Sequence, residues 1–247
     1  MKSSKLLHAL LLPVLLSLAS PLFAAGGPTP YPAQTDEAAW LGVGPIRCHP
    51  WMVDNRAWFW TQREKDQGAV VFVGDSLMGG WKTLQKDFSS LKVANRGIGG
   101  DVSRGMLFRF QEDVLDLHPR AIVLVAGSND LSTQTAPANA IANISAIVDM
   151  ARKATPAIPI VICTIPPRNA PKAPLKPGAL KDLNARLIAF GAGKENLVVV
   201  DLFTVLATPS GDITPGFFAA DGIHLMPPAY EKWAALLRPA LASLGVK

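Results

Sequence analysis

From residue 69 onward, the chain alternates short apolar runs with longer segments that have helical spacing. Runs rich in Val, Ile and Leu predict strands at 69–73, 91–94, 121–126, 158–164 and 197–201. Apolar positions three and four apart predict helices over 104–117, 136–153, 180–191 and 229–244. Because the strands are apolar throughout and separated by helices, they indicate a parallel sheet covered on both faces. The expected fold class is α/β, a three-layer α/β/α domain with about five strands.

The first 24 residues have a different pattern, typical of a secretory signal peptide. Two lysines precede a Leu-rich run over 6–19, and small residues follow it up to Ala24. A membrane anchor is the alternative, but His8 and Pro13 interrupt the run, which is shorter than the roughly 20 residues that a bilayer span needs. We expect cleavage, export to the periplasm or the medium, and no stable membrane anchor afterwards.

Residues 25–67 form an expected N-terminal extension with one helix, followed by the α/β domain over 68–247. The extension is rich in Gly and Pro up to residue 50, and a helix is predicted over 54–67 with its aromatic residues directed partly inward. It carries four tryptophans, which could form a sugar-binding wall or pack the extension onto the core: Trp40, Trp51, Trp58 and Trp60. We expect packing.

Composition and charge narrow the function classes. The chain has 247 residues, of which 49% are hydrophobic, enough for one sizeable core. Without Lys2 and Lys5, the 24 basic residues become 22 against 19 acidic ones, so the mature chain has a formal charge of +3. The basic residues are scattered, so we expect no nucleic-acid partner.

Export would permit a disulfide between Cys48 and Cys163, but Cys163 lies in an apolar run and is expected to be a buried free thiol.

Candidate chemistry follows three predicted strands. In parallel sheets, ligands bind beyond the carboxyl ends of the strands. There the chain places Gly74-Asp75-Ser76-Leu77, the glycine-rich segment 95–101, and Gly127-Ser128-Asn129-Asp130. Each segment also has a plain structural interpretation, because Ser and Asn often cap helices and glycine often forms turns.

A fourth segment, Asp221-Gly222-Ile223-His224, offers a carboxylate three residues before an imidazole. This spacing lets the carboxylate orient the ring and stabilise its protonated form. Of the other histidines, His8 leaves with the signal, His49 lies in the extension and His118 precedes a strand. His224 is therefore the histidine best placed to act as a base.

Together the four segments resemble blocks I, II, III and V of the SGNH/GDSL hydrolases, in the family's order. Segment 95–101 is especially similar to the branch containing platelet-activating-factor acetylhydrolase-like and bacterial carbohydrate acetylesterases. The resemblance implies a flavodoxin-like sheet, a nucleophile at Ser76, a general base at His224 and Asp221 as its orienting partner. It also implies an oxyanion hole formed by the N–H groups of Ser76 and Gly100 and the side chain of Asn129. No metal or cofactor is implied.

The expected function is hydrolysis of a short acyl ester, acetyl foremost, on a carbohydrate or another small molecule. An O-acyltransferase, a lysophospholipase or a thioesterase would use the same site, and a catalytically silent binding protein is the non-enzyme alternative. Oligomeric state is left open.

Two segments near the predicted site depart from a simple pattern. The basic, proline-rich stretch 166–177 could contact an acidic polysaccharide or lipid head group, but we expect a solvated loop. Met226-Pro227-Pro228 follows His224 and Leu225, where many relatives have a polar residue. The last helix should still begin there because proline is tolerated at the first helical position, while the rim beside His224 becomes more apolar.

Overall fold

The structure, a computed structural model, describes residues 26–247. The predicted signal peptide, residues 1–24, lies outside the described residues. Within 26–247, none of the helices combines the length and the apolar character that crossing a bilayer requires.

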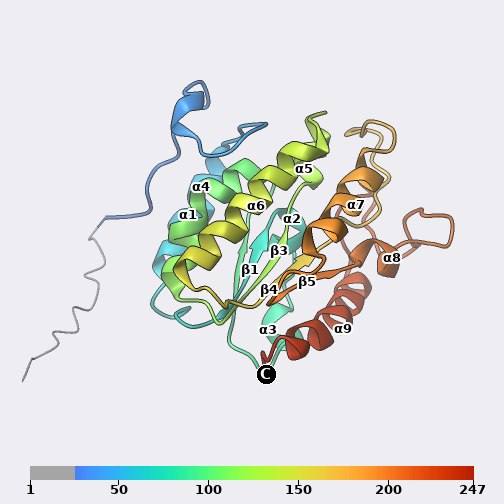
Figure 1. Ribbon diagram of the computed structural model, residues 1–247. Helices are drawn as coiled ribbons and strands as arrows, with labels where there is room; N and C mark the ends of the chain where they lie inside the picture. Colours follow the sequence, from blue (N-terminus) through green and yellow to red (C-terminus); the bar gives the residue numbers. More distant parts are fainter. Residues whose placement is uncertain (1–25) are drawn as a thin grey trace, which may run out of the picture.

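Five strands form one parallel sheet at the centre of the domain (Figure 1). Their order is β2-β1-β3-β4-β5, and β1 and β3 are buried at every residue. The strands are β1 (Val70–Gly74), β2 (Val93–Gly97), β3 (Ala121–Val125), β4 (Ile160–Cys163) and β5 (Leu197–Val200). The strand order reverses between β1 and β3, as in flavodoxin-like sheets. The predicted fold class and number of strands are confirmed.

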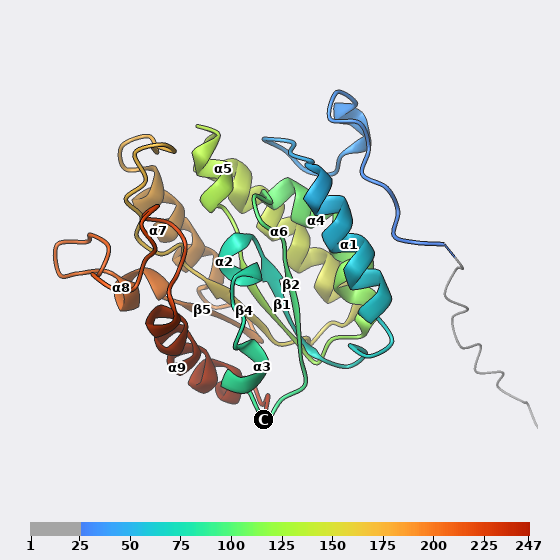
Figure 2. The same ribbon diagram turned by 180° about the vertical axis from the view of Figure 1, so that it is seen from behind.

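Helices cover both faces of the sheet (Figures 1 and 2). One face carries α1 (Pro50–Gln62), α4 (Ser103–Asp113), α6 (Pro137–Ala154) and α7 (Ala179–Gly191). The other carries α2 (Ser76–Gly79), α3 (Leu84–Asp87), α8 (Leu202–Leu206) and α9 (Pro227–Ser243). Short elements complete the chain: η1 (Glu37–Ala39), η2 (Leu115–Leu117) and α5 (Ser128–Ser132). The last helix begins at Pro227, as expected.

The predicted bounds of α1 and β2 were wrong for physical reasons, and the helix predicted over 104–117 ends at Asp113, ahead of the separate turn η2. Helix α1 begins at Pro50 instead of residue 54, because proline fits the first helical turn, and it ends at Gln62. Strand β2 continues to Gly97, through residues predicted to form a loop. The polar side chain of Arg96 is tolerated in this strand because it forms an ion pair with Asp66 at 2.8 Å.

Only some of the tryptophans of the extension pack against the domain. Trp40 is 3% exposed, and Arg104 of α4 donates hydrogen bonds to its carbonyl oxygen and to other carbonyl oxygens of the extension. Trp60 is half-buried. Trp51 and Trp58, in contrast, are 49% and 61% exposed. The prediction that the tryptophans pack the extension onto the core holds for Trp40 and is wrong for Trp51 and Trp58.

A buried ionic network connects α4 to the ends of β1 and β2. The guanidinium group of Arg109 lies 2.8 Å from Asp101 and 3.2 Å from Asp113. It also donates hydrogen bonds to the carbonyl oxygens of Gly74 and Arg96. Because a buried charge is tolerated only with such partners, the network fixes where the loops after β1 and β2 begin.

Both cysteines are free thiols. Cys163 is buried, and its sulfur accepts a hydrogen bond of 3.3 Å from Nε1 of Trp233. Burial raises the pKa of Cys163 to about 12, so this thiol is unreactive at neutral pH.

Candidate active site

The candidate nucleophile lies on a tight turn between β1 and α2. Asp75 is the N-cap of α2, and its carboxylate accepts the backbone N–H of Leu77 at 2.9 Å. Ser76 is therefore the first residue of the helix and is not needed as its cap. The hydroxyl of Tyr230 on α9 donates to the carbonyl oxygen of Leu77 at 2.8 Å, which ties this turn to the opposite end of the chain.

Asp221 and His224 form a hydrogen-bonded pair. Nδ1 of His224 lies 2.5 Å from Oδ2 of Asp221. The other carboxylate oxygen accepts the backbone N–H groups of Ile223 and His224, at 2.9 and 3.0 Å. Partial burial opposes ionisation of Asp221, but the hydrogen bonds from His224 and Ile223 outweigh it and lower the pKa to about 2. Asp221 is thus an anion at any ordinary pH, and Nε2 of His224 is the ring nitrogen left for chemistry.

Residues 166–177, which lie between β4 and α7, hold this pair in place; we call this segment the strap. The N–H of Asn169 in the strap donates to the carbonyl oxygen of Gly222 at 2.9 Å. Gly222 has φ +69°, and a Cβ at this position would overlap the backbone of Asn169. Only glycine fits at position 222, so the strap and the Asp–His loop are packed against one another.

The predicted oxyanion donors lie on the two neighbouring strand ends. Gly100 has φ +82° in the loop after β2. Asn129 lies in the first turn of α5, whose N-cap is Gly127, so Asn129 does not serve as the cap either. Its Nδ2 donates to the carbonyl oxygen of Asp101 at 3.0 Å and to Oδ2 of Asp75 at 3.3 Å.

One cavity of about 590 Å³ brings the predicted residues together. Its wall includes Ser76, Gly100, Asn129 and His224, and Asp221 is hydrogen bonded to His224. Among the described residues, no hydrogen bond joins the Ser76 hydroxyl to His224. Such bonds are often long in a free enzyme and shorten when substrate binds.

Two residues of the extension also line this cavity: Arg47, which the sequence did not single out, and Trp51, one of the tryptophans considered above for a sugar-binding wall. Nη1 of Arg47 donates to the carbonyl oxygen of Gly100 at 3.0 Å and lies 3.4 Å from Oδ1 of Asn129. Nε1 of Trp51 donates to the carbonyl oxygen of Gly99 at 2.9 Å. The region before residue 50 has no periodicity, so only the long-range contact with the loop after β2 reveals the role of Arg47.

Asp75 directly precedes Ser76 in the chain and is fully buried. Burial raises its pKa to about 7; the N–H of Leu77 opposes this shift, and the nearby carboxylates of Asp101 and Asp130 add to it. The carboxyl group is therefore protonated in mildly acidic solution.

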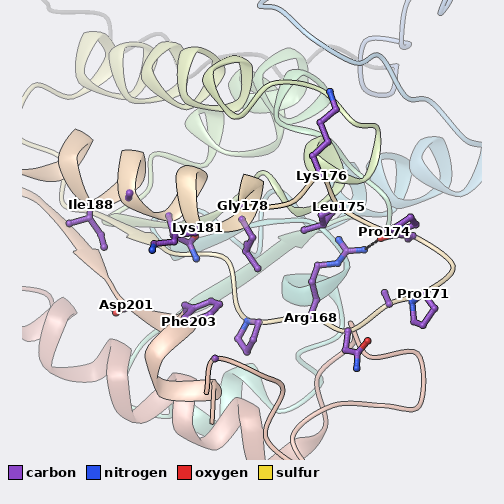
Figure 3. A pocket seen from close by; sticks show the side chains of 18 residues that line it. Arg168, Pro171, Pro174, Leu175, Lys176, Gly178, Lys181, Ile188, Asp201 and Phe203 are labelled. Atoms are coloured by element: carbon purple, nitrogen blue, oxygen red, sulfur yellow. Dashed lines mark hydrogen bonds between the residues drawn. The ribbon is translucent and has the colours of Figure 1, made fainter. Parts of the chain in front are cut away.

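A second cavity, of about 780 Å³, is shown in Figure 3. It is bounded by the strap, by α7 with Lys181 and Ile188, and by Phe203 of α8. Arg168 and Pro174 of the strap line both cavities. The strap was expected to be a solvated loop, but Arg168 is half-buried and its guanidinium group donates to the hydroxyl of Ser132 at 2.9 Å.

Over residues 26–247, there is no group of three or more His, Cys, Asp or Glu side chains arranged to hold an ion.

Sequence comparison identifies the family. The family model described as "GDSL-like Lipase/Acylhydrolase family" matches residues 72–232, from the first strand into the last helix. This chain belongs to the GDSL-like lipase/acylhydrolase family. It is a carboxylic ester hydrolase, as predicted, and the predicted resemblance is confirmed.

Relatives of this GDSL-like acylhydrolase include mammalian acetylhydrolase subunits. It is 29% identical over 176 residues to platelet-activating factor acetylhydrolase IB subunit alpha2 of Rattus norvegicus, covering 70% of each chain. Among solved structures, a candidate acylhydrolase from Bacteroides fragilis aligns with a TM-score of 0.70 and 26% identity, over 81% of this chain and 100% of that one. A GDSL-like lipase from Bacteroides thetaiotaomicron gives a TM-score of 0.66 at 24% identity, over 75% and 96% of the two chains, and shows the shared fold.

Proposed function

We propose that this acylhydrolase is an exported serine esterase that removes a short acyl group, acetyl foremost, from a carbohydrate. Ser76 is the nucleophile, His224 the general base and Asp221 its orienting partner. The observation that carries the proposal is the hydrogen-bonded Asp221–His224 pair on the same cavity as Ser76. Gly100 and Asn129 lie on that cavity as well.

In the first half-reaction, the Ser76 hydroxyl attacks the ester carbonyl carbon and its proton passes to Nε2 of His224. The Asp221 carboxylate stabilises the resulting imidazolium through Nδ1. The tetrahedral intermediate then collapses, the C–O bond to the alcohol breaks, and His224 returns the proton to the departing alcohol oxygen. An acyl group remains on Ser76.

The developing negative oxygen is held by the N–H groups of Ser76 and Gly100 and by the amide of Asn129. Nδ2 of Asn129 carries two hydrogens, and the one that contacts Asp75 at 3.3 Å is held more weakly than the one that contacts Asp101 at 3.0 Å. It is therefore the hydrogen that turns to the negative oxygen when substrate binds. In the second half-reaction, water gives its proton to His224 and attacks the acyl carbon, which releases the acid and restores Ser76.

Two observations support a short acyl group on a sugar. The curated relatives are named acetylhydrolases. Trp51 is half-exposed on the cavity wall, with His49 stacked on it at 4.3 Å between ring centroids. An indole held in this way offers an apolar face to the C–H groups of a sugar ring and a position that is already ordered. Export is supported by the signal-peptide pattern of residues 1–24.

The test follows acetate release by the purified mature chain from acetylated xylan, beside 4-nitrophenyl esters of increasing acyl length. We expect the acetate ester to be cleaved fastest and acetylated xylan to be deacetylated. Ser76→Ala should lose both activities, while Ser90→Ala, at an exposed serine, should retain them.

The same assay separates the competing activities. Preference for a long-chain lysophospholipid or a thioester would contradict the proposed substrate class. Acylated product in place of free acid, on addition of a polyol, would indicate an acyltransferase.

A further inference from the structure

The cavity wall carries an excess of positive charge. Arg47 comes from the extension, and Arg168 and Lys172 come from the strap. Among the described residues that line the cavity, the only carboxylate is Asp75, which directly precedes Ser76 and is itself fully buried. Three cations thus face a space that contains no exposed counter-charge.

Arg47 is only partly used by the protein. Its Nη1 contacts Gly100 and Asn129, both beside the predicted oxyanion hole. Across residues 26–247 it has no ion pair, and its Nε and Nη2 atoms make no hydrogen bond. The guanidinium group is therefore anchored by one nitrogen, and the rest of its fork remains available to a ligand.

Arg168, in the strap, is a second cation that forms no ion pair among the described residues. It donates only to uncharged oxygens: the carbonyl and hydroxyl of Ser128, the hydroxyl of Ser132 and the carbonyl of Ala173. Its Nε is buried without a partner. Burial lowers the pKa of Arg168, and the buried Asp75 offsets this only in part. A half-buried cation without an ion pair is costly unless a ligand supplies the missing counter-charge. Arg47 and Arg168 contact consecutive residues, Asn129 and Ser128, in the first turn of α5, just after β3, so they lie around one strand end.

From these contacts we infer that the cavity selects acyl esters that carry a carboxylate on the alcohol part, such as an acylated uronic acid, with Arg47 as the main specificity residue. A guanidinium fork recognises a planar carboxylate through paired hydrogen bonds. Arg168 and Lys172 add attraction at longer range. The inference rests on the proposed function, because it assigns a substrate class to that same site.

This inference gives the N-terminal extension a role in substrate recognition. The family match begins at residue 72, whereas Arg47 and Trp51 precede it. The catalytic residues belong to the shared domain, and the group that recognises the substrate's charge is added by residues before it.

The experiment uses a matched pair of chromogenic acetates, 4-acetoxy-3-nitrobenzoate and its uncharged methyl ester. The preference is the ratio of their kcat/KM values, each divided by the rate of hydroxide-catalysed hydrolysis. Because both rates come from one sample, a change in the fraction of folded enzyme cancels. Variants are Arg47→Gln, Arg47→Lys, Arg47→Glu and Lys172→Gln, with Arg186→Gln as a control for the loss of one charge at an exposed site outside both cavities.

We expect wild type and Arg186→Gln to prefer the anionic ester by about tenfold, the size of a well-formed charge-assisted contact. Arg47→Gln should bring the ratio close to one, Arg47→Lys should keep part of it, and Arg47→Glu should reverse it. The preference should weaken in 0.5 M salt because the contact is solvent-accessible. Lys172→Gln should lower it less than Arg47→Gln does.

A wild-type ratio of one or below, or a ratio unchanged by Arg47→Glu, overturns the inference while ester hydrolysis itself stands. If neither acetate is cleaved, the proposed function fails and the inference fails with it. A second arm compares acetylated methyl glucuronoside with an anionic lysophospholipid in vesicles, and faster cleavage of the lipid would overturn the carbohydrate assignment.

Discussion

Nδ1 of His224 lies 2.5 Å from Oδ2 of Asp221, while the second oxygen of the same carboxylate is held by two backbone N–H groups. The carboxylate is therefore fixed at both oxygens. An imidazole tied to such a group has one tautomer and one orientation, and the proposed transfer of the Ser76 proton requires both.

Removing the charge of Asp221 should disable catalysis without unfolding the chain. Asp221→Asn should lower kcat for 4-nitrophenyl acetate by on the order of 10³–10⁴, because the amide favours the wrong tautomer of His224. Rate assays of each variant measure kcat, and thermal melts measure stability. Asp54→Asn, at an exposed carboxylate of α1, is the matched control. A loss below tenfold in Asp221→Asn would contradict the proposed role.

Truncating Asn129 should affect the rate more than substrate binding. Asn129→Ala removes one oxyanion donor, so kcat should fall by about 10²–10³ with little change in KM. Asn139→Ala, on α6 outside the cavity, should retain full activity. A higher KM at unchanged kcat would show that Asn129 binds the ground state and is not a donor to the transition state.

The fold was predictable because its signals are local, and the candidate catalytic residues stand in equally local patterns. Buried strands such as 121–126 are apolar along their whole length, and Ser76 and Asn129 directly follow strands that can be read from the sequence. The end of β2 was not predictable in this way. Arg96 is polar and belongs in a strand only because Asp66, from a different part of the chain, neutralises it.

The extension was predicted least well. Trp51 and Trp58 lie on the same helix and both are exposed, but it is Trp51 that lines the cavity. Arg47 stands in a segment without periodicity, and its role depends on contacts with residues 53 and 82 positions away. Local patterns carry no information about such contacts.

These two tryptophans provide a direct test of the cavity wall. Trp51→Ala should lower kcat/KM for acetylated xylan by about tenfold, because it removes an aromatic face and the hydrogen bond to Gly99. Trp58→Ala removes an equally large and more exposed ring from the same helix and should leave kcat/KM unchanged. Equal effects of the two substitutions would mean that α1 contributes only stability.

Asp75 should make stability depend on pH. Its pKa is about 7 in the folded chain and near 3.8 when unfolded, so the folded state binds more protons between these values. The free energy of unfolding contributed by Asp75 therefore falls as pH rises from about 4 to 7. Asp75→Asn should remove this slope. Its free energy of unfolding, taken relative to that of wild type, should be about 1–3 kcal/mol higher at pH 8 than at pH 5. Urea unfolding at the two pH values measures the difference; the same difference at both would contradict a raised pKa.

Labelling with a fluorophosphonate tests the central claim most directly, because the reagent reacts only with a serine that its own site has activated. The mature chain is treated with the probe and digested, and the modified residue is located by mass spectrometry. We predict a single adduct on Ser76, slower labelling in Asp221→Asn, and none in Ser76→Ala. An adduct on another serine, or no labelling of a folded wild-type chain, would contradict the assignment of Ser76 as the nucleophile.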